Sequence, residues 1–172
     1  PGRRDSLLLE LDEIDAPDPV LDWEEVFGNA HSVEIEIGIG KGRFLIDAAQ
    51  KYLQVNYVGI ERASKYLRIA HARSLRYKLQ HVRLVRADAQ EFFEFFIPLE
   101  SVQAIHLYFP DPWPKKRHHK RRLFNAYFLR EVERTLKPKG HLWLATDHEE
   151  YFLAMLEVLD GSTCLREVQM EW

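Results

Sequence analysis

Short apolar segments with strand character alternate with helical segments along most of this 172-residue chain. The strand-like segments are 33–38, 56–61, 81–86, 102–109 and 141–146, and the helical segments are 42–52, 64–79, 92–96, 121–136 and 149–159. A strand–helix–strand alternation produces right-handed crossovers, which place parallel strands in one sheet with helices on both faces. The sequence therefore predicts an α/β fold with a mainly parallel sheet.

The two ends of the chain depart from this alternation. Residues 1–19 show little periodicity, so we expect a loose arm, followed by a short helix over 22–28 that Asp22 caps and Gly28 ends. We assign residues 1–30 to this arm and helix and residues 31–172 to one domain. A last strand is expected from Thr163 to Met170. The start at Pro1 rather than Met favours a chain trimmed at one end or both.

Composition narrows the class of protein. No apolar run approaches the roughly 20 residues that span a bilayer, and no signal-peptide pattern opens the chain, so we expect a cytoplasmic protein without a membrane partner. The single cysteine, Cys164, excludes an internal disulfide and is expected to be a small buried side chain. The adjacent His118 and His119 cannot face one metal ion as an i, i+4 helical pair would, so no metal site is predicted.

Charge is unevenly distributed, although the formal net charge is only −3. Residues 1–36 are rich in acids, whereas residues 115–122 hold six Lys or Arg and two His. A basic run is usually a solvated surface, but local charge matters more than the sum for a polyanionic partner. If all six cations contacted phosphates, log affinity against log salt would have a slope of about −4 to −5.

Functional side chains are expected where the strands end, because ligands of parallel sheets bind at the carboxyl edge. The residues at or just after the ends of the five strands are Gly38, Glu61, Asp88, Asp111 and Asp147. The first strand leads into Gly38-Ile-Gly40-Lys-Gly42, where bare main chain can approach a ligand closely. The spacing matches neither the dinucleotide fingerprint nor the phosphate P-loop. On its own, this turn is equally compatible with a simple tight connection.

Acids at the next two strand ends indicate a nucleoside. Glu61 lies 19 residues after Gly42, where a carboxylate accepts from both hydroxyls of a ribose. Asp88 follows the third strand and can accept from an adenine amino group, while the small Ala89 leaves room for the ring. Either acid alone could be a loop carboxylate or a helix cap. Together with the glycine turn they favour a nucleoside cofactor that lacks a pyrophosphate.

The segment Tyr108-Phe-Pro-Asp-Pro-Trp-Pro-Lys-Lys-Arg117 follows the fourth strand. Proline fixes its own φ angle and restrains the residue before it, so the three prolines hold Asp111 and Trp113 in a stiff loop. Trp113 has two interpretations, a base-stacking residue or an anchor of the loop. The basic run follows at once, which favours phosphate contacts by residues such as Arg117 and Lys120.

These motifs together resemble the bacterial tRNA (guanine-N7-)-methyltransferase family. The similarity covers nearly the whole chain from Asp22 to about Leu159. It rests on Glu36-Ile-Gly-Ile-Gly-Lys-Gly42, Gly59-Ile-Glu61, Ala87-Asp-Ala89, Tyr108–His118 and Ala145-Thr-Asp147. The fourth piece is highly specific, and the first three occur in many methyltransferases.

The resemblance implies a class I (Rossmann-like) methyltransferase fold and transfer of a methyl group from S-adenosylmethionine to a tRNA. The product would be S-adenosylhomocysteine, and the target would be N7 of guanine 46 in the variable loop. It also implies that Glu36, Gly38, Gly40, Gly42, Glu61, Asp88, Ala89 and Asp111 line the cofactor side. Lys115 and Asp147 would contact the substrate, beside Arg117 and Lys120 of the basic run, and Asp111 would be the catalytic residue.

One departure from the family concerns the C-terminal part, where a Thr-x-x-Glu motif usually helps to hold the substrate. Here Glu167 lies four residues after Thr163, which is the wrong spacing. Two alternatives stay open: a class I methyltransferase of another RNA or a small molecule, and a non-catalytic RNA-binding module on the same fold. The sequence does not choose between a monomer and a homodimer.

Overall fold

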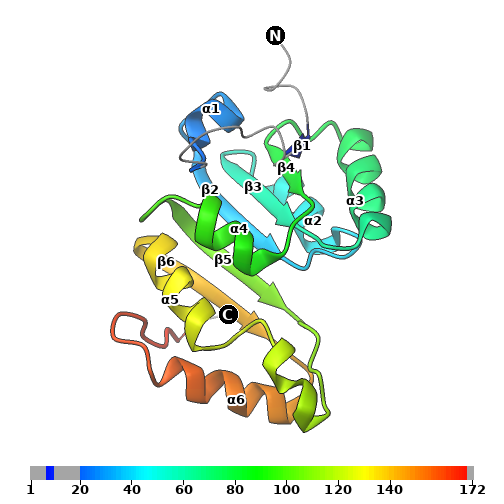
Figure 1. Ribbon diagram of the computed structural model, residues 1–172. Helices are drawn as coiled ribbons and strands as arrows, with labels where there is room; N and C mark the ends of the chain where they lie inside the picture. The colour runs from blue at the N-terminus through cyan, green and yellow to red at the C-terminus, as the bar shows by residue number, and fades with distance from the viewer. Residues whose placement is uncertain (1–6, 10–19, 170–172) are drawn as a thin grey trace.

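Apolar residues form six parallel strands within residues 7–9 and 20–169, the part of the chain that the computed structural model describes (Figure 1). The strands are β1 (Leu8–Leu9), β2 (Ser32–Ile37), β3 (Val55–Ile60), β4 (Val82–Val85), β5 (Val102–Tyr108) and β6 (Leu136–Ala145). Their order across the sheet is β1-β4-β3-β2-β5-β6, and every neighbouring pair is parallel. The predicted α/β fold is confirmed.

Helices follow the strands in the predicted alternation. They are α1 (Trp23–Phe27), α2 (Arg43–Lys51), α3 (Ser64–Arg76), α4 (Ala89–Phe96), the 3₁₀ helix η2 (Lys116–Arg121), α5 (Ala126–Thr135) and α6 (Glu149–Leu159). The predicted caps of α1 are confirmed, since the Asp22 carboxylate accepts from the amides of Glu24 and Glu25 and Gly28 adopts φ 72°. No helix in the described ranges has the length and apolar character needed to cross a lipid bilayer.

Two apolar clusters fill the space between the sheet and its helices. One cluster includes Leu45, Leu67 and Leu84 and lies under α2 and α3. The other includes Ile35, Ile105 and Phe128 and lies under α4 and α5. Burying one such side chain contributes about 1.5–3 kcal/mol. An apolar layer therefore covers each face of the sheet, so ligands can reach the sheet only at its edges.

Strand β2 shows how the sequence divides the two faces. Side chains alternate along a strand, so Val33, Ile35 and Ile37 all enter the α4–α5 cluster. Glu34 and Glu36 consequently face the α2 side, where the backbone N–H of Leu45 bonds to Glu36. The strand is thus apolar on one side and carries two carboxylates on the other.

The switch in strand order lies between β2 and β5. From β2 the chain continues to β3 and β4 on one side, and it then returns to β5 and β6 on the other. A crevice at the carboxyl ends of the strands is expected at such a point. The glycine turn that follows β2 and the proline-rich loop that follows β5 therefore emerge next to each other.

The prediction of a loose arm over residues 1–19 is wrong for Leu8 and Leu9. These residues form β1 and pair with Leu84 and Val85 of β4. The backbone amide of Leu84 also donates to the carbonyl of Leu7 at 2.7 Å. The rest of the predicted arm, residues 1–6 and 10–19, lies outside the described residues.

The helix predicted over 121–136 begins later, at Ala126. Asn125 caps it by accepting from the amides of Tyr127 and Phe128, both at 3.0 Å. Strand β6 starts directly after this helix at Leu136, whereas the sequence predicted a turn over 137–140 and a strand from 141. The early part of β6 pairs irregularly with β5, with a register shift between Val102 and Ala104.

The strand predicted from Thr163 onward is absent from residues 163–169, and Met170 lies outside the described residues. Ser162 explains the difference, because its hydroxyl accepts from the amides of Cys164 and Leu165 and so holds the chain in a turn. The same hydroxyl donates to Glu133 at 2.5 Å. Cys164 is exposed, so its predicted burial is also wrong.

Candidate active site

The glycine turn between β2 and α2 adopts the backbone conformation that glycine permits most readily. Gly38 has φ 71° and Gly40 has φ 52°, both in the left-handed region. A Cβ atom on either residue would meet nothing within 4 Å, so their main chain borders open space. This is the exposure that a ligand approaching bare backbone requires.

Gly42 differs from the other two glycines of the turn. A Cβ atom there would lie 2.9 Å from the Cβ of Ala70 in α3, and Gly42 is buried. Its small size lets α2 and α3 approach each other. The structure thus supplies a packing reason for this glycine beside the predicted cofactor contact.

Glu61 ties the glycine turn to the start of α3. Its Oε2 accepts from the amide of Gly40 at 2.9 Å, and its Oε1 accepts from the amide of Ala63 at 2.8 Å. A carboxylate oxygen has two acceptor directions, so each oxygen can still accept from a ligand hydroxyl. Glu61 therefore fixes the turn from the same position at which a ribose contact was predicted.

Glu36 is the buried acid of the site, with 6% of its surface exposed. Burial raises its pKa to about 8, and the hydrogen bond from the Leu45 amide opposes that rise. Its Oε2 has no hydrogen-bond partner among the described residues. Buried polar atoms without partners are uncommon and often await a ligand. A cationic group that reached this oxygen would meet an unsatisfied acceptor, so Glu36 fits the ammonium end of an amino-acid-bearing cofactor.

A buried polar chain next to Glu36 was missed from the sequence. His106 of β5 contacts Oε2 of Glu34 through Nε2 at 3.0 Å and the Tyr108 hydroxyl through Nδ1 at 2.8 Å. A carboxylate only accepts, so in the neutral imidazole Nε2 donates to Glu34 and Nδ1 accepts from Tyr108. The ring of Phe44 lies 4.8 Å from that of His106 and 4.9 Å from that of Tyr108.

This chain places Tyr108 close to the two acids of β2. Burial raises the pKa of Tyr108 to about 12, and the charges of Glu36 and Glu34 contribute to the rise. Tyr108 begins the proline-rich segment, so one hydrogen-bonded chain joins that segment to the cofactor half of the site. The period-two spacing of residues 34 and 36, and of 106 and 108, was the signal available in the sequence.

Asp88 follows β4 and caps α4. Its Oδ1 accepts from the amide of Gln90 at 3.0 Å, and its Oδ2 lies 3.5 Å from Nη1 of Arg62. The side chain is 38% exposed, so it remains open to a ligand. Ala89 is the first residue of α4 and half-buried, as a small wall of a ring site would be.

The proline-rich loop after β5 is held in an unusual backbone conformation at both ends. Phe109 has φ 50° and Trp113 has φ 44°, both in a region that bulky residues rarely adopt. The amide of Phe109 donates to the carbonyl of Ala145 in β6 at 2.7 Å. Between these points Asp111 is exposed, and its charge helps to raise the pKa of Tyr151, which places it near α6.

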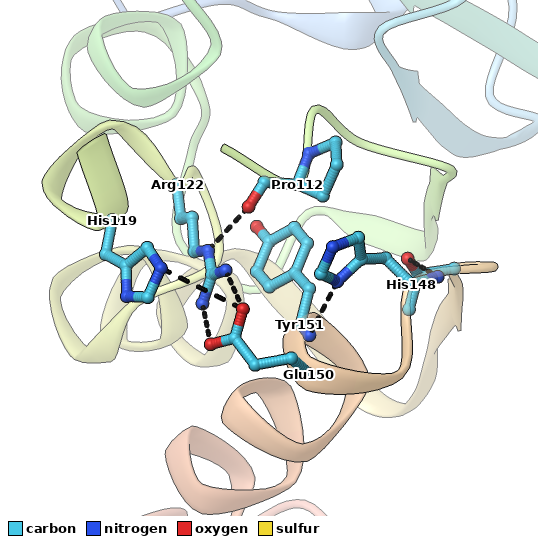
Figure 2. A network of polar contacts seen from close by, with 7 residues as sticks. Pro112, His119, Arg122, His148, Glu150 and Tyr151 are labelled. Carbon is cyan, nitrogen blue, oxygen red and sulfur yellow. Dashed lines mark hydrogen bonds and ion pairs between the residues drawn. The ribbon is translucent and has the colours of Figure 1, made fainter. Parts of the chain in front are cut away.

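Arg122 anchors this loop to α6, as Figure 2 shows. Its Nε donates to the carbonyl of Pro112 at 2.8 Å, and its Nη1 and Nη2 donate to the carboxylate of Glu150 at 3.0 and 2.5 Å. Its guanidinium also lies 4.7 Å from the centre of the Tyr151 ring. Nε2 of His119 lies 3.8 Å from Oε2 of Glu150.

The case in which all six cations of residues 115–122 contact phosphates is therefore not the one that the structure supports. Arg122 is only 7% exposed and is bound to Pro112 and Glu150. Lys115, Arg117 and Lys120 are exposed, as predicted for substrate contacts. Five cations remain, and phosphate contacts by all five would contribute about −3.5 to −4.5 to the salt slope.

Trp113 is packed within its own segment. The Arg121 guanidinium lies 4.8 Å from the centre of its ring, and His118 contacts it edge-on at 5.9 Å. Of the two interpretations left open by the sequence, these contacts favour an anchor of the loop. Asp147, the remaining predicted substrate residue, is exposed just after β6. No cluster of His, Cys, Asp or Glu within residues 7–9 and 20–169 is arranged to hold a metal ion.

Comparisons with known proteins show which proteins this chain is similar to. Residues 30–172 match the protein family described as "Putative methyltransferase". A tRNA (guanine-N(7)-)-methyltransferase of Aliivibrio salmonicida is 42% identical over 149 residues, covering 87% of this chain and 63% of that protein. An enzyme of the same name from Enterococcus faecalis is 42% identical over 130 residues, covering 76% of this chain and 60% of that protein. The chain thus spans less than two thirds of the length of these relatives.

The fold is also that of known methyltransferases. The crystal structure of precorrin-6y C5,15-methyltransferase from Geobacter metallireducens superimposes with a TM-score of 0.60 at 18% identity, covering 87% of this chain and 65% of that one. This likeness confirms the class I (Rossmann-like) fold that the resemblance implied. The matched region, residues 30–172, contains the glycine turn, the buried acid and the proline-rich loop described above. This chain therefore belongs to the family described as "Putative methyltransferase".

Proposed function

We propose that this chain transfers a methyl group from S-adenosylmethionine to N7 of guanine 46 in tRNA. The observation that carries the proposal is the rigid loop around Asp111, which Arg122 and Glu150 hold beside the glycine turn at the switch in strand order. The names of the relatives that share this segment support the same activity. Residues 31–172 would form the methyltransferase domain, and the cytoplasm, where tRNA is found, would be its location.

The residues of the β2–β3–β4 half would hold the methyl donor. When bound, S-adenosylmethionine supplies an electrophilic methyl group on a sulfonium. Glu36 offers an unsatisfied oxygen to its ammonium group, Glu61 two acceptors to the ribose, and Asp88 an acceptor to the adenine amino group. Gly38 and Gly40 leave the main chain bare where the cofactor lies against it, and Ala89 leaves room for the adenine ring.

Guanine N7 carries an in-plane lone pair and no proton at neutral pH, so its attack needs no general base. Positive charge moves onto the purine during the transfer. We infer that Asp111 orients the guanine by accepting from its N1–H and amino group, and that its charge stabilises the purine as positive charge develops. Alignment of this kind contributes about 7–11 kcal/mol in favourable cases.

The exposed cations that follow the loop would hold the RNA. Lys115, Arg117 and Lys120 are exposed where phosphates could reach them, and Asp147 is exposed at the end of the neighbouring strand β6. Arg122 has a different role, since it fixes the loop that carries Asp111. Different residues of one basic segment would therefore bind the RNA and fix the loop that aligns the guanine.

The test is methyl transfer to an unmodified tRNA transcript, followed by mapping of the modified nucleotide. We expect one methyl group per tRNA at guanine 46, with no incorporation into a transcript that has adenine at this position. Methylation at an atom other than guanine N7 would overturn the proposed specificity. Binding of tRNA without any binding of S-adenosylmethionine by calorimetry would instead establish a non-catalytic RNA-binding module.

A further inference from the structure

Helix α3 carries a second basic surface that the site described above does not use. Lys65, Arg68, Arg73 and Arg76, here called the basic face of α3, line one open hollow of about 460 Å³. Ile69 and Ala72 form the rest of its lining. Lys65 and Arg68 are three positions apart, as are Arg73 and Arg76, and the two pairs are eight positions (about two helical turns) apart, so all four cations lie on one side of the helix.

No acid neutralises this surface from within its own segment. Residues 62–87 contain eight Lys or Arg and not one Asp or Glu, although the whole chain has a net charge of −3. Arg62 pairs with Asp88, and Arg83 is buried against Phe27, so neither belongs to the surface. Within the described ranges, no carboxylate forms an ion pair with the basic face of α3.

The surface adjoins the glycine turn. Nη1 of Arg73 donates to the carbonyl of Lys41 at 3.0 Å, which connects the middle of α3 to the turn between β2 and α2. The basic run of residues 115–122 lies on the opposite side of the switch point, after β5. Two or three strand spacings, about 10–14 Å, separate the strands that carry the two surfaces.

The length of the basic face of α3 indicates which class of anionic ligand it suits. The eleven residue steps from Lys65 to Arg76 correspond to about 16 Å along a helix. A single phosphate group could contact only one end of such a row, whereas a nucleic-acid strand presents a negative charge every few ångströms along its axis. The floor residues Ile69 and Ala72 offer no aromatic ring for a base to stack on. The arrangement suits a phosphate backbone, without sequence readout.

We propose that the basic face of α3 binds backbone phosphates of the RNA whose guanine enters the site, so that the substrate is gripped on both sides of the switch point. The inference rests on the proposed function and deepens it. The face steers and holds the RNA, while the reacting base is positioned by the loop around Asp111.

The test uses a variant that removes three charges, Lys65→Gln/Arg68→Gln/Arg76→Gln. Arg73 is kept because it supports the glycine turn. The control, Lys51→Gln/Lys137→Gln/Lys139→Gln, removes three exposed cations that lie at the end of α2 and the start of β6, near the amino-terminal edge of the sheet. Affinity for unmodified tRNA is measured at several salt concentrations, and affinity for S-adenosylmethionine by calorimetry.

We expect the α3 variant to reduce the slope of log affinity against log salt by about 2 to 3, and to bind tRNA roughly a hundredfold more weakly at 0.1 M salt. The control should keep the wild-type slope, and both variants should bind S-adenosylmethionine as the wild type does. The separate variant Arg68→Lys/Arg76→Lys, which keeps every charge, should have nearly the wild-type slope. An unchanged slope in the α3 variant, or an equal loss in the control, overturns the inference.

The two proposals fail in distinguishable ways. If the wild type methylates tRNA and the α3 variant keeps its slope, the inference about α3 is wrong and the proposed function stands. If the wild type binds tRNA with the expected dependence on α3 but transfers no methyl group, the proposed activity is wrong and the RNA surface stands. A wild type that binds no tRNA overturns both.

Discussion

The two halves of the carboxyl edge of the sheet are built on different principles. In the β2–β3–β4 half, a few acids are held one by one: Glu61 accepts from two backbone amides, and Glu36 is buried with one oxygen unsatisfied. In the β5–β6 half, most charges are exposed, and one buried cation, Arg122, fixes the loop. The first half suits a small ligand that must be enclosed, and the second suits a polymer that must be gripped without being enclosed.

The largest effect should come from Asp111, the exposed acid of the second half. With saturating tRNA and S-adenosylmethionine, Asp111→Asn should reduce turnover by about 10²–10³-fold, because it removes a charge and an acceptor at the reacting base. Rapid-quench methyl transfer measures this. Turnover near the wild-type rate would show that the loop only shapes the site and carries no catalytic residue.

A substitution of Arg122 tests whether methyl transfer depends on a rigid loop or on the positive charge of the basic run. Arg122→Met should reduce methyl transfer by about 100-fold, since displacing a loop by about 1 Å can have that effect. The affinity for S-adenosylmethionine should stay unchanged, because the Arg122 side chain bonds to Pro112 of the loop and packs on Glu150 and Tyr151 of α6, away from the glycine turn. The control is Lys116→Met, which removes an exposed cation of the same run and leaves the contact between Arg121 and Trp113 intact. Equal losses in both variants would contradict an anchoring role.

Glu36 tests the first half through pH. Its folded-state pKa of about 8 lies above the ordinary 4.5, so the folded chain retains a proton that the unfolded chain releases between these values. Its contribution to stability is fully present below pH 4.5 and is lost as the pH rises through 8. Relative to Glu36→Gln, the ligand-free wild type should lose about 3–5 kcal/mol over this range. Denaturant titrations at several pH values measure the difference.

The same proton gives a second readout for Glu36. Binding of a cationic cofactor should favour the charged carboxylate, so the wild type should release more protons on binding S-adenosylmethionine at pH 7 than Glu36→Gln does. Calorimetry in buffers with different ionisation enthalpies measures the release. Equal proton release in the two proteins would show that Glu36 does not face the cationic end of the cofactor.

The smallest effect concerns the support of the glycine turn. Gly42→Ala should destabilise the fold by about 1–3 kcal/mol, because its Cβ would meet that of Ala70 at 2.9 Å and its φ is 70°. Gly28→Ala is the matched control, since φ is 72° there but the added Cβ meets nothing within 4 Å. The difference between the two losses measures the close packing of α2 and α3. No difference would mean that backbone conformation alone requires glycine at 42.

The features that could be predicted from the sequence are those that depend on residues close together in the chain. The Asp22 cap, the Gly28 stop and the acids at the strand ends all follow from local patterns, and alternation of segments then implied the sheet. Long-range partners could not be predicted in this way. His106 and Glu34 are 72 residues apart, and Arg122 resembled its exposed neighbours until Glu150, 28 positions away, was placed beside it. Asn125 is an intermediate case, because Asn is a residue type that often caps helices, but the helix predicted over 121–136 ran through it.

Strand β1 has a consequence for the behaviour of the protein in solution. Its two residues cover the outer edge of β4, which would otherwise present unpaired amides and carbonyls to any other strand. So short an edge strand offers a second molecule very little to pair with. Leu8 and Leu9 therefore protect this edge of the sheet against strand-to-strand aggregation. Replacing both with proline should make the protein prone to self-association without altering the site that would bind the methyl donor.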